Sequence, residues 1–316
     1  MPDTLRPRSI ADLPAQKASA PATPAQARAR FFNPGNAFNM ILPPVPDKAF
    51  ADEPAKALDP STPTGLIDCD ASAAMACGFP ATSPLVLASY ARIRAGETLE
   101  LEHRASGVVH YVIQGSGVTD CGCEIVEWGP GDLFITPGGA SLSHKAGDAD
   151  AVLWIVSNEP QLAFEHAQPP EPGDAPTPVV HCTGEEMRRQ IDYLYEIEKD
   201  GEVPGMALIF SSDQQEASRN ALPTLTVAMN TLDPGVIQRP HRHNSVAVSL
   251  VVQGDGCFSK IDGRKKDWSP WATTITPPVS VHSHHNEGQE RAFFLIVQDG
   301  GFYYHARAMG FEFVDD

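Results

Sequence analysis

The two halves of this chain repeat each other. A shift of 139 positions superposes Gly96 on Gly235, and the Gln-Gly-x-Gly pattern of residues 114–117 on the same pattern at residues 253–256. After one inserted residue the correspondence continues with Trp128 on Trp268, Pro130 on Pro270 and Thr136-Pro137 on Thr276-Pro277. Because self-similarity at a fixed spacing indicates a duplicated unit, we expect two copies of one module.

Each copy is predicted to be built from short β-strands. Apolar or alternating runs, such as residues 84–93, 110–113, 132–136 and 152–156, are separated by glycine and proline turns. This spacing is typical of a β-sandwich or barrel. With 316 residues and 42% hydrophobic residues, the chain is long enough for both modules to bury a core.

Composition predicts how the modules are joined. Residues 1–30 contain Pro, Ala, Gln and Thr without an apolar core segment, so we expect a flexible N-terminal arm. Residues 168–182 begin with a proline-rich run that can form neither helix nor strand, and they predict a linker. The modules then span residues 31–167 and 183–316.

A helix is expected directly after the linker. Thr183-Gly-Glu-Glu186 resembles a capping box, and apolar residues share one helical face from there to about Asp200. We expect this helix to pack across the two modules. A partner-binding helix is the alternative.

Five of the eleven histidines lie in two short patches, His241-Arg242-His243 and His282-Ser283-His284-His285. Side chains at i and i+2 of a strand project from one face, so two imidazoles can converge on one ion while a third arrives from another strand. The pattern predicts a mononuclear metal site. Surface histidines on an edge strand are the alternative, but they leave His282 and the glycine and proline spacing unexplained.

The order of elements around these patches is similar to that of the two cupin motifs. A turn glycine, Gly235, precedes the His-x-His pair; an apolar strand, a Gly-x-Gly turn, Thr276-Pro277 and the returning His282 follow. The resemblance implies an all-β fold of two tandem cupin barrels (double-stranded β-helices, or jelly rolls) with a few short helices.

The repeat predicts which barrel holds the metal. His241 and His243 correspond to Glu102 and Arg104 in the first module, and an arginine cannot ligate a metal because it stays protonated. We therefore expect a metal-free first barrel. His103, His110 and His144 remain there and could form some other cluster; a purely structural barrel is the alternative.

The second barrel also lacks a common cupin ligand. Many cupins place a glutamate seven residues before the final turn glycine, where this chain has Ser249. Three neutral imidazoles would leave a divalent ion its full charge and open coordination positions. Such a centre favours an anionic bidentate substrate with O2 beside it.

At this point the sequence resembles the bicupin ring-cleaving dioxygenases, the gentisate and salicylate 1,2-dioxygenase family. The resemblance rests on His241-Arg242-His243, on the absent glutamate and on His282-Ser283-His284. It implies Fe(II) held by His241, His243 and His282, with O2 bound alongside a substrate that chelates the iron through hydroxyl and carboxylate. The ring would open next to the carboxyl-bearing carbon, as in extradiol-type cleavage. His284 would contact the substrate and assist proton movement as the catalytic histidine.

One position departs from the family pattern. The family commonly has an arginine six residues after the second ligand, where this chain has Ser249, which we expect to line the substrate site. Arg239 could supply the missing charge, because strand alternation would face it with His241 and His243. A solvent-facing Arg239 is the alternative. The departure could also reflect a substituted salicylate, or a hydroquinone without a carboxylate.

Overall composition bounds the partners. A net charge of −17 and a pI near 5.0 argue against a nucleic-acid surface. No apolar run approaches the roughly 20 residues that span a bilayer, residues 1–29 do not read as a secretory signal, and six scattered cysteines suit a reducing cytoplasm. We expect a cytoplasmic enzyme of aromatic catabolism that assembles as a dimer or tetramer and takes a small aromatic acid and O2.

Two other classes of function stay open on these residues. One is another three-histidine metal cupin enzyme, such as a hydroquinone, diketone or thiol dioxygenase, a lyase or an isomerase. The other is a non-catalytic bicupin that binds a metal or a small ligand. Fold alone does not separate these classes, because cupins carry many chemistries.

Overall fold

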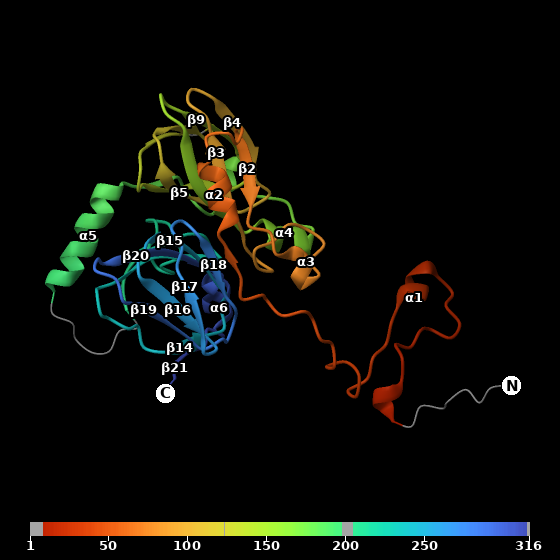
Figure 1. Cartoon of the computed structure of the whole chain (residues 1–316). Coiled ribbons are helices and arrows are strands. Elements are labelled where there is room, and N and C mark those ends of the chain that lie inside the picture. The colour runs from red at the N-terminus through yellow and green to blue at the C-terminus, as the bar shows by residue number, and fades with distance from the viewer. Residues whose placement is uncertain (1–8, 123, 198–204, 315–316) are drawn as a thin grey trace. The chain divides into compact units, whose positions relative to one another are not determined.

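The computed structural model describes residues 9–122, 124–197 and 205–314 (Figure 1). The chain divides into two compact units, residues 1–43 and 44–316. The first unit contains a 3-10 helix (Ile10–Asp12) and helix α1 (Pro24–Arg28), and a pair of backbone hydrogen bonds joins Gln16 to Phe31. Part of the predicted arm, residues 1–8, lies outside the described residues. The predicted domain limits stay predictions, since the second unit holds both barrels.

The second unit is mostly antiparallel β-sheet, and its first half forms one barrel. A six-stranded sheet has the order β11-β8-β5-β10-β3-β2, and a four-stranded sheet has the order β4-β9-β6-β7. The strands are β2 (Gly65–Asp68), β3 (Leu87–Ile93), β4 (Thr98–Glu102), β5 (Gly107–Gln114), β6 (Gly117–Asp120), β7 (Ile125–Trp128), β8 (Leu133–Pro137), β9 (Ser141–Ala146), β10 (Ala151–Ser157) and β11 (Val180–Cys182).

The second half forms a barrel of the same kind. Its sheets have the orders β1-β18-β15-β20-β13-β12 and β17-β16-β19-β14-β21. The strands are β1 (Ala49–Phe50), β12 (Met206–Phe210), β13 (Thr226–Leu232), β14 (His241–His243), β15 (Ala247–Gln253), β16 (Cys257–Ile261), β17 (Arg264–Asp267), β18 (Thr273–Thr276), β19 (His282–Asn286), β20 (Ala292–Gln298) and β21 (Phe311–Phe313).

Helices are few and short, as predicted. They are α2 (Asp52–Leu58), α3 (Ser72–Met75), α4 (Glu159–Glu165), a 3-10 helix (Pro172–Asp174), α5 (Gly184–Glu196) and α6 (Gly300–Ala306). No helix in the described part of the chain is long and apolar enough to cross a membrane.

Helix α5 begins where the capping box predicted it. The Thr183 hydroxyl accepts a hydrogen bond from the Glu186 amide, but the helix ends at Glu196 rather than near Asp200, because Ile197 is already extended. Met187 and Ile191 are buried on one helical face. They line a small cavity together with Tyr111 of the first barrel and Met229 and Phe293 of the second. The helix therefore packs across both barrels.

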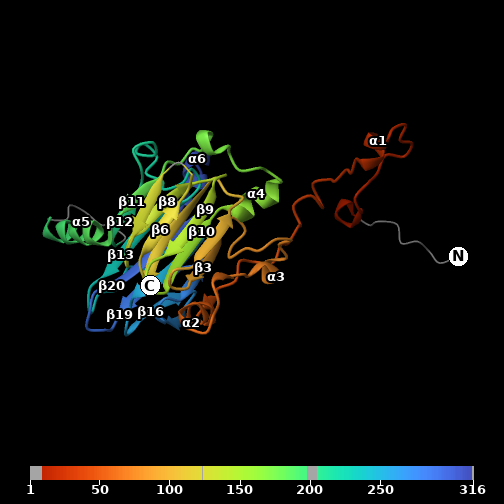
Figure 2. The same ribbon diagram turned by 90° about the horizontal axis from the view of Figure 1, so that it is seen from above.

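The strand orders confirm the repeat predicted from the sequence. The series β8-β5-β10-β3 in the first barrel corresponds to β18-β15-β20-β13 in the second. Each barrel also gains an edge strand from a segment outside its own repeat: β1 pairs with β18, and β11 pairs with β8. Figure 2 shows the layered sheets from above.

The six-stranded sheets meet in a shared core. On β10, Leu153 and Ile155 face the interior of the first barrel, whereas Trp154 belongs to a cluster that includes residues of the second. The Trp154 indole donates to Thr273 Oγ1 at 2.9 Å, and the Tyr90 hydroxyl bonds the same oxygen at 2.7 Å. A strand packed on both faces is apolar throughout, which explains the continuous hydrophobic run of β10.

Candidate metal centre

Two adjacent strands bring three histidines together at one end of the second barrel. His241 and His243 lie on β14, and His282 lies on β19 directly across from His241. Strand alternation buries both β14 histidines and turns Arg242 outward, where it pairs with Glu312. One ring nitrogen from each histidine lies within 4.8 Å of the others, in the only such group among the described residues.

Each histidine is oriented by a backbone carbonyl. The Nδ1 atoms of His241, His243 and His282 bond the carbonyls of Arg239, Ser245 and Ser280, at 2.8, 2.8 and 3.0 Å. Since a carbonyl only accepts, Nδ1 carries the proton in each ring, and Nε2 has the lone pair that can bind a metal; in His243 the Gln298 amide nitrogen lies 3.4 Å from that atom. This is how metal-ligating histidines are held in proteins. The three residues therefore fit a divalent first-row metal ion.

Burial keeps these imidazoles uncharged. Desolvation lowers the pKa of His241, and it lowers the pKa of His243 to about 4 and that of His282 to about 2. Neutral imidazole is the form that binds a metal. Since no carboxylate lines the surrounding pocket in the described part of the chain, the ligand set is neutral, as the sequence predicted.

His284 is buried beside the triad and has a different hydrogen-bond partner. Its Nδ1 lies 2.8 Å from the Ser259 hydroxyl, which also accepts a hydrogen bond of 2.8 Å from the Trp268 indole. Among the described residues Nδ1 is the acceptor available to the Ser259 hydroxyl proton, because the Trp268 indole can only donate, so the hydroxyl donates to Nδ1. Nε2 then carries the ring proton, so His284 lines the pocket as a hydrogen-bond donor and is not part of the convergent group. The adjacent His285 stacks on Phe258, 4.5 Å between ring centroids.

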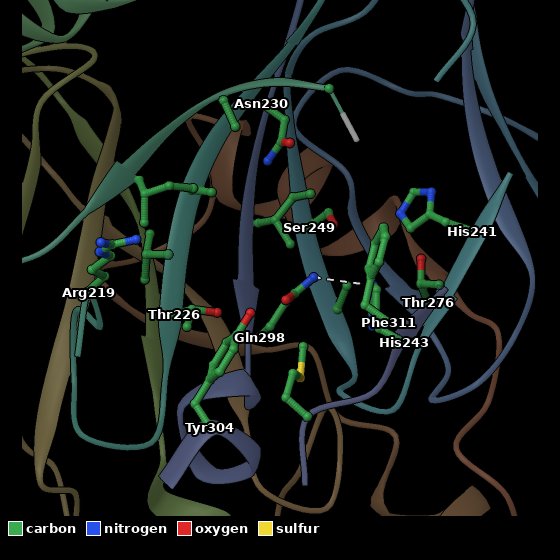
Figure 3. A pocket seen from close by; sticks show the side chains of 18 of the residues that line it. Arg219, Thr226, Asn230, His241, His243, Ser249, Thr276, Gln298, Tyr304 and Phe311 are labelled. Carbon is green, nitrogen blue, oxygen red and sulfur yellow. Dashed lines mark hydrogen bonds between the residues drawn. The ribbon is translucent and has the colours of Figure 1, made fainter. Parts of the chain in front are cut away.

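The triad opens into a pocket of about 540 Å³ (Figure 3). The predicted residues Ser249 and His284 line it. Sequence reasoning missed several others, because they come from separate strands, a loop and the C-terminal helix and strand. These are Arg219, Thr226, Asn230, Gln238, Thr276, Gln298, Tyr304 and Phe311.

Two of these residues reach the metal ligands. The Gln298 amide nitrogen lies 3.4 Å from His243 Nε2, and the Phe311 ring lies 5.3 Å from the His241 ring, centroid to centroid. Phe311 lies on β21, which pairs with β14, and it stands directly opposite His243. The C-terminal strand therefore helps to enclose the candidate metal site.

The structure does not place Arg239 with these residues. Arg239 is exposed, its guanidinium carbon lies 4.5 Å from the centroid of the Phe313 ring, and the neighbouring Gln238 lines the pocket instead. The expected alternation fails because β14 begins only at His241, after Pro240. The alternative reading, a solvent-facing arginine, describes its position.

The first barrel has no equivalent triad. Glu102 and Arg104 stand at the positions of His241 and His243. The ring nitrogens of His103, His110 and His144 do not converge into a ligand group within the described residues. Instead, His103 bonds Glu159 at 2.9 Å, and His110 stacks on Phe134 at 4.4 Å between ring centroids.

Curated proteins are similar to part of this chain. No protein-family model matches the chain. A 5-aminosalicylate 1,2-dioxygenase of Comamonas sp is 38% identical over 84 residues, which are 26% of this chain and 22% of that protein. A gentisate 1,2-dioxygenase of Ralstonia sp is 32% identical over 88 residues, or 28% of this chain and 25% of that protein. The chain thus matches about a quarter of the length of these curated relatives.

Similarity to solved structures extends over most of the chain. A salicylate 1,2-dioxygenase from Pseudaminobacter salicylatoxidans superposes with a TM-score of 0.73 at 15% identity, covering 88% of this chain and 91% of that one. A structure of the salicylate 1,2-dioxygenase with gentisate gives 0.72 at 16% identity, covering 86% of each chain. These likenesses establish the fold as two tandem cupin barrels. In local sequence and in fold, the chain resembles the bicupin ring-cleaving 1,2-dioxygenases, as its histidine patches predicted.

Proposed function

We propose that this protein is an Fe(II)-dependent dioxygenase that opens the ring of a hydroxybenzoate-type aromatic, such as gentisate, salicylate or a substituted salicylate. The observation that carries this proposal is the set of three buried, neutral histidines whose unprotonated ring nitrogens converge in a pocket without a carboxylate in its described lining. The curated relatives, named for gentisate and 5-aminosalicylate, support it. A cytoplasmic homo-oligomer remains the predicted form.

Ferrous iron at this site would supply a redox-active dicationic centre with room for two substrate oxygens and O2 side by side. The chain's own contribution is to position the reactants. A deprotonated hydroxyl and a carboxylate from one ring would compensate the charge that the neutral ligands leave uncompensated. Fixing the ring next to O2 converts a three-body encounter into a positioned reaction.

The pocket side chains can orient such a substrate. Ser249 and Thr276 present hydroxyl groups, and the Gln298 amide lies next to a ligand nitrogen. The His284 Nε2–H can donate to a substrate oxygen and pass a proton during ring opening, whereas its Nδ1 stays bonded to Ser259. Burial lowers the pKa of His284 to about 3, so the resting ring is neutral.

Oxygen uptake tests the proposal directly. Protein loaded with Fe(II) under anoxic conditions is mixed with aerated buffer and a panel of hydroxybenzoates, and O2 consumption is followed with the loss of ring absorbance. We expect one O2 consumed per ring opened with at least one salicylate-type compound that carries an additional electron-active ring substituent, gentisate being the simplest. Uptake with a diketone or thiol, and with no hydroxybenzoate or hydroquinone, would overturn the proposed substrate class.

A further inference from the structure

The pocket around the candidate metal centre carries one permanent charge. Arg219 is the only Lys, Arg, Asp or Glu among the described residues that line it. The other polar lining groups are neutral hydroxyls, amides and imidazoles. Arg219 is exposed and also lines an adjoining hollow with Asp213 and Glu216, but no acidic residue lines the metal pocket within the described residues, so the one permanent charge there favours an anionic ligand.

The backbone holds Arg219 in a defined place. It lies within the loop between β12 and β13, at the end of a turn over residues 213–219, with φ of 56°, in the left-handed region that residues other than glycine seldom adopt. The Arg219 amide donates to the Gln215 carbonyl at 2.8 Å, and the next residue, Asn220, is buried and bonded to Pro223. No hydrogen bond or ion pair joins the Arg219 guanidinium to another residue in the described ranges, so the group can bind a ligand.

Arg219 and the metal ligands lie at different ends of the pocket. Figure 3 shows Arg219 on one side and His241 and His243 on the other, with Ser249 and Gln298 between them. A carboxylate that chelates the metal therefore cannot also bind Arg219. A ligand chelated at the metal would reach Arg219 only through a second group.

The size of the pocket allows such a ligand. Its volume of about 540 Å³ lies within the range of roughly 300–1,000 Å³ typical of cavities that enclose drug-sized molecules. A single ring bearing one carboxylate and one or two hydroxyls leaves much of this space unfilled. Tyr304 also lines the cavity, on the side of Gln298 away from His241 and His243 in Figure 3, and adds an aromatic wall there.

We propose that the substrate is an elongated aromatic hydroxy acid with a second anionic group far from the chelating pair, and that Arg219 binds this group. A guanidinium matches the two oxygens of a carboxylate in a bidentate, charge-assisted hydrogen bond. The proposal rests on the proposed function for the orientation of the chelating end. It makes Arg219 a specificity-determining residue.

Anoxic calorimetry on the Fe(II) protein tests this pairing of charges. The probes are salicylates substituted at position 5 with a carboxylate, attached directly or through one or two methylenes, each compared with its uncharged carboxamide. We expect at least one carboxylate to bind about tenfold to a hundredfold more tightly than its amide, the effect of one hydrogen-bonded ion pair. Equal affinity within every pair would overturn the proposal.

Substitutions test whether Arg219 causes the preference for the carboxylate over the amide. Arg219→Gln should abolish the difference between carboxylate and amide and leave salicylate binding within about twofold of the parent. Arg239→Gln is the matched control, because Arg239 is exposed and outside the pocket lining; it should keep the preference. A preference that survives Arg219→Gln would show that another group binds the anion.

The proposed function can fail separately. If salicylate does not bind the Fe(II) protein, chelation and the hydroxybenzoate substrate are wrong. The anion site is then measured on metal-free protein with phenylpropanoate against phenylpropanamide, which need no metal. A preference for the acid that Arg219→Gln removes would keep the assignment of Arg219, and equal binding would overturn it.

Discussion

The two barrels share one internal hydrogen-bond relay and differ in what surrounds it. In each, a tryptophan indole donates to a hydroxyl that bonds Nδ1 of a histidine on the equivalent strand. The relays are Trp268–Ser259–His284, with distances of 2.8 and 2.8 Å, and Trp128–Thr119–His144, with distances of 2.9 and 2.7 Å. The relay therefore belongs to the module and does not require a metal site.

The side chains around the relay differ at the positions where the second barrel has its metal pocket. In the first barrel His110 stands where the second has Ser249, and Leu142 stands where the second has His282. His110 and Leu142 are almost completely buried, and the His110 ring stacks on Phe134. Larger side chains thus fill the space that small and ligating residues leave open in the second barrel. A common fold carries the site only where the side chains permit it.

The largest expected effect is the loss of metal and activity when a ligand of the second barrel is removed. His282→Ala leaves two protein ligands, too few to hold a labile ferrous ion, so we expect loss of metal and of activity in a protein that stays folded. Elemental analysis, oxygen uptake and circular dichroism check this. The parent should contain about one metal per chain; two equally filled sites would show that the first barrel also binds metal. A fully metallated, active His282→Ala protein would show that another residue is the ligand.

The next largest effect should come from the relay histidines, because substituting the one in the second barrel should lower turnover far more than substituting the one in the first. His284→Ala removes a proton-transfer group without removing a ligand, so iron should be retained and turnover should fall by roughly two to four orders of magnitude. His144→Ala is the matched control at the same position of the first barrel, and its effect on turnover should be small. Unchanged turnover in His284→Ala would reduce that residue to a packing role, and loss of iron would make it a ligand.

The hydroxyl of the relay should have a smaller effect. Ser259→Ala leaves the Trp268 indole and His284 Nδ1 without their shared partner, so the ring is no longer held with its proton on Nε2. We expect turnover to fall by roughly tenfold to a hundredfold with iron retained, as for partners that orient an active-site histidine. Ser259→Thr should restore it, since Thr119 occupies the same position in the first barrel. Failure of threonine to rescue would show that the defect comes from packing.

The comparison of the barrels also shows which features the sequence could predict and which it could not. The repeat predicted the matching strand orders, and the i, i+2 spacing predicted the triad, because both depend on strand periodicity alone. Strand alternation does not extend to Arg239, because β14 begins at His241, after Pro240, and the solvent-facing alternative describes its position. Arg219 and Phe311 carry no local pattern: one reaches the pocket through a loop with left-handed backbone, and the other through a C-terminal strand that pairs with β14.

The smallest expected effect concerns acid stability of the first barrel. His110 is fully buried, neither ring nitrogen has a partner among the described residues, and desolvation lowers its pKa well below the ordinary value of 6.5. Below pH 6.5 the unfolded chain therefore binds a proton that the folded chain excludes. The free energy of unfolding should fall as the pH drops from 6.5, by at most about 1.4 kcal/mol per pH unit for this histidine.

His110→Leu removes the titrating group, so the free energy of unfolding of this variant should fall less steeply between pH 7 and pH 5 in urea titrations. His305→Leu, on an exposed histidine of α6, is the control that should keep the parental slope. Equal slopes for the parent and His110→Leu would mean that His110 accepts a proton in the folded barrel as readily as in the unfolded chain.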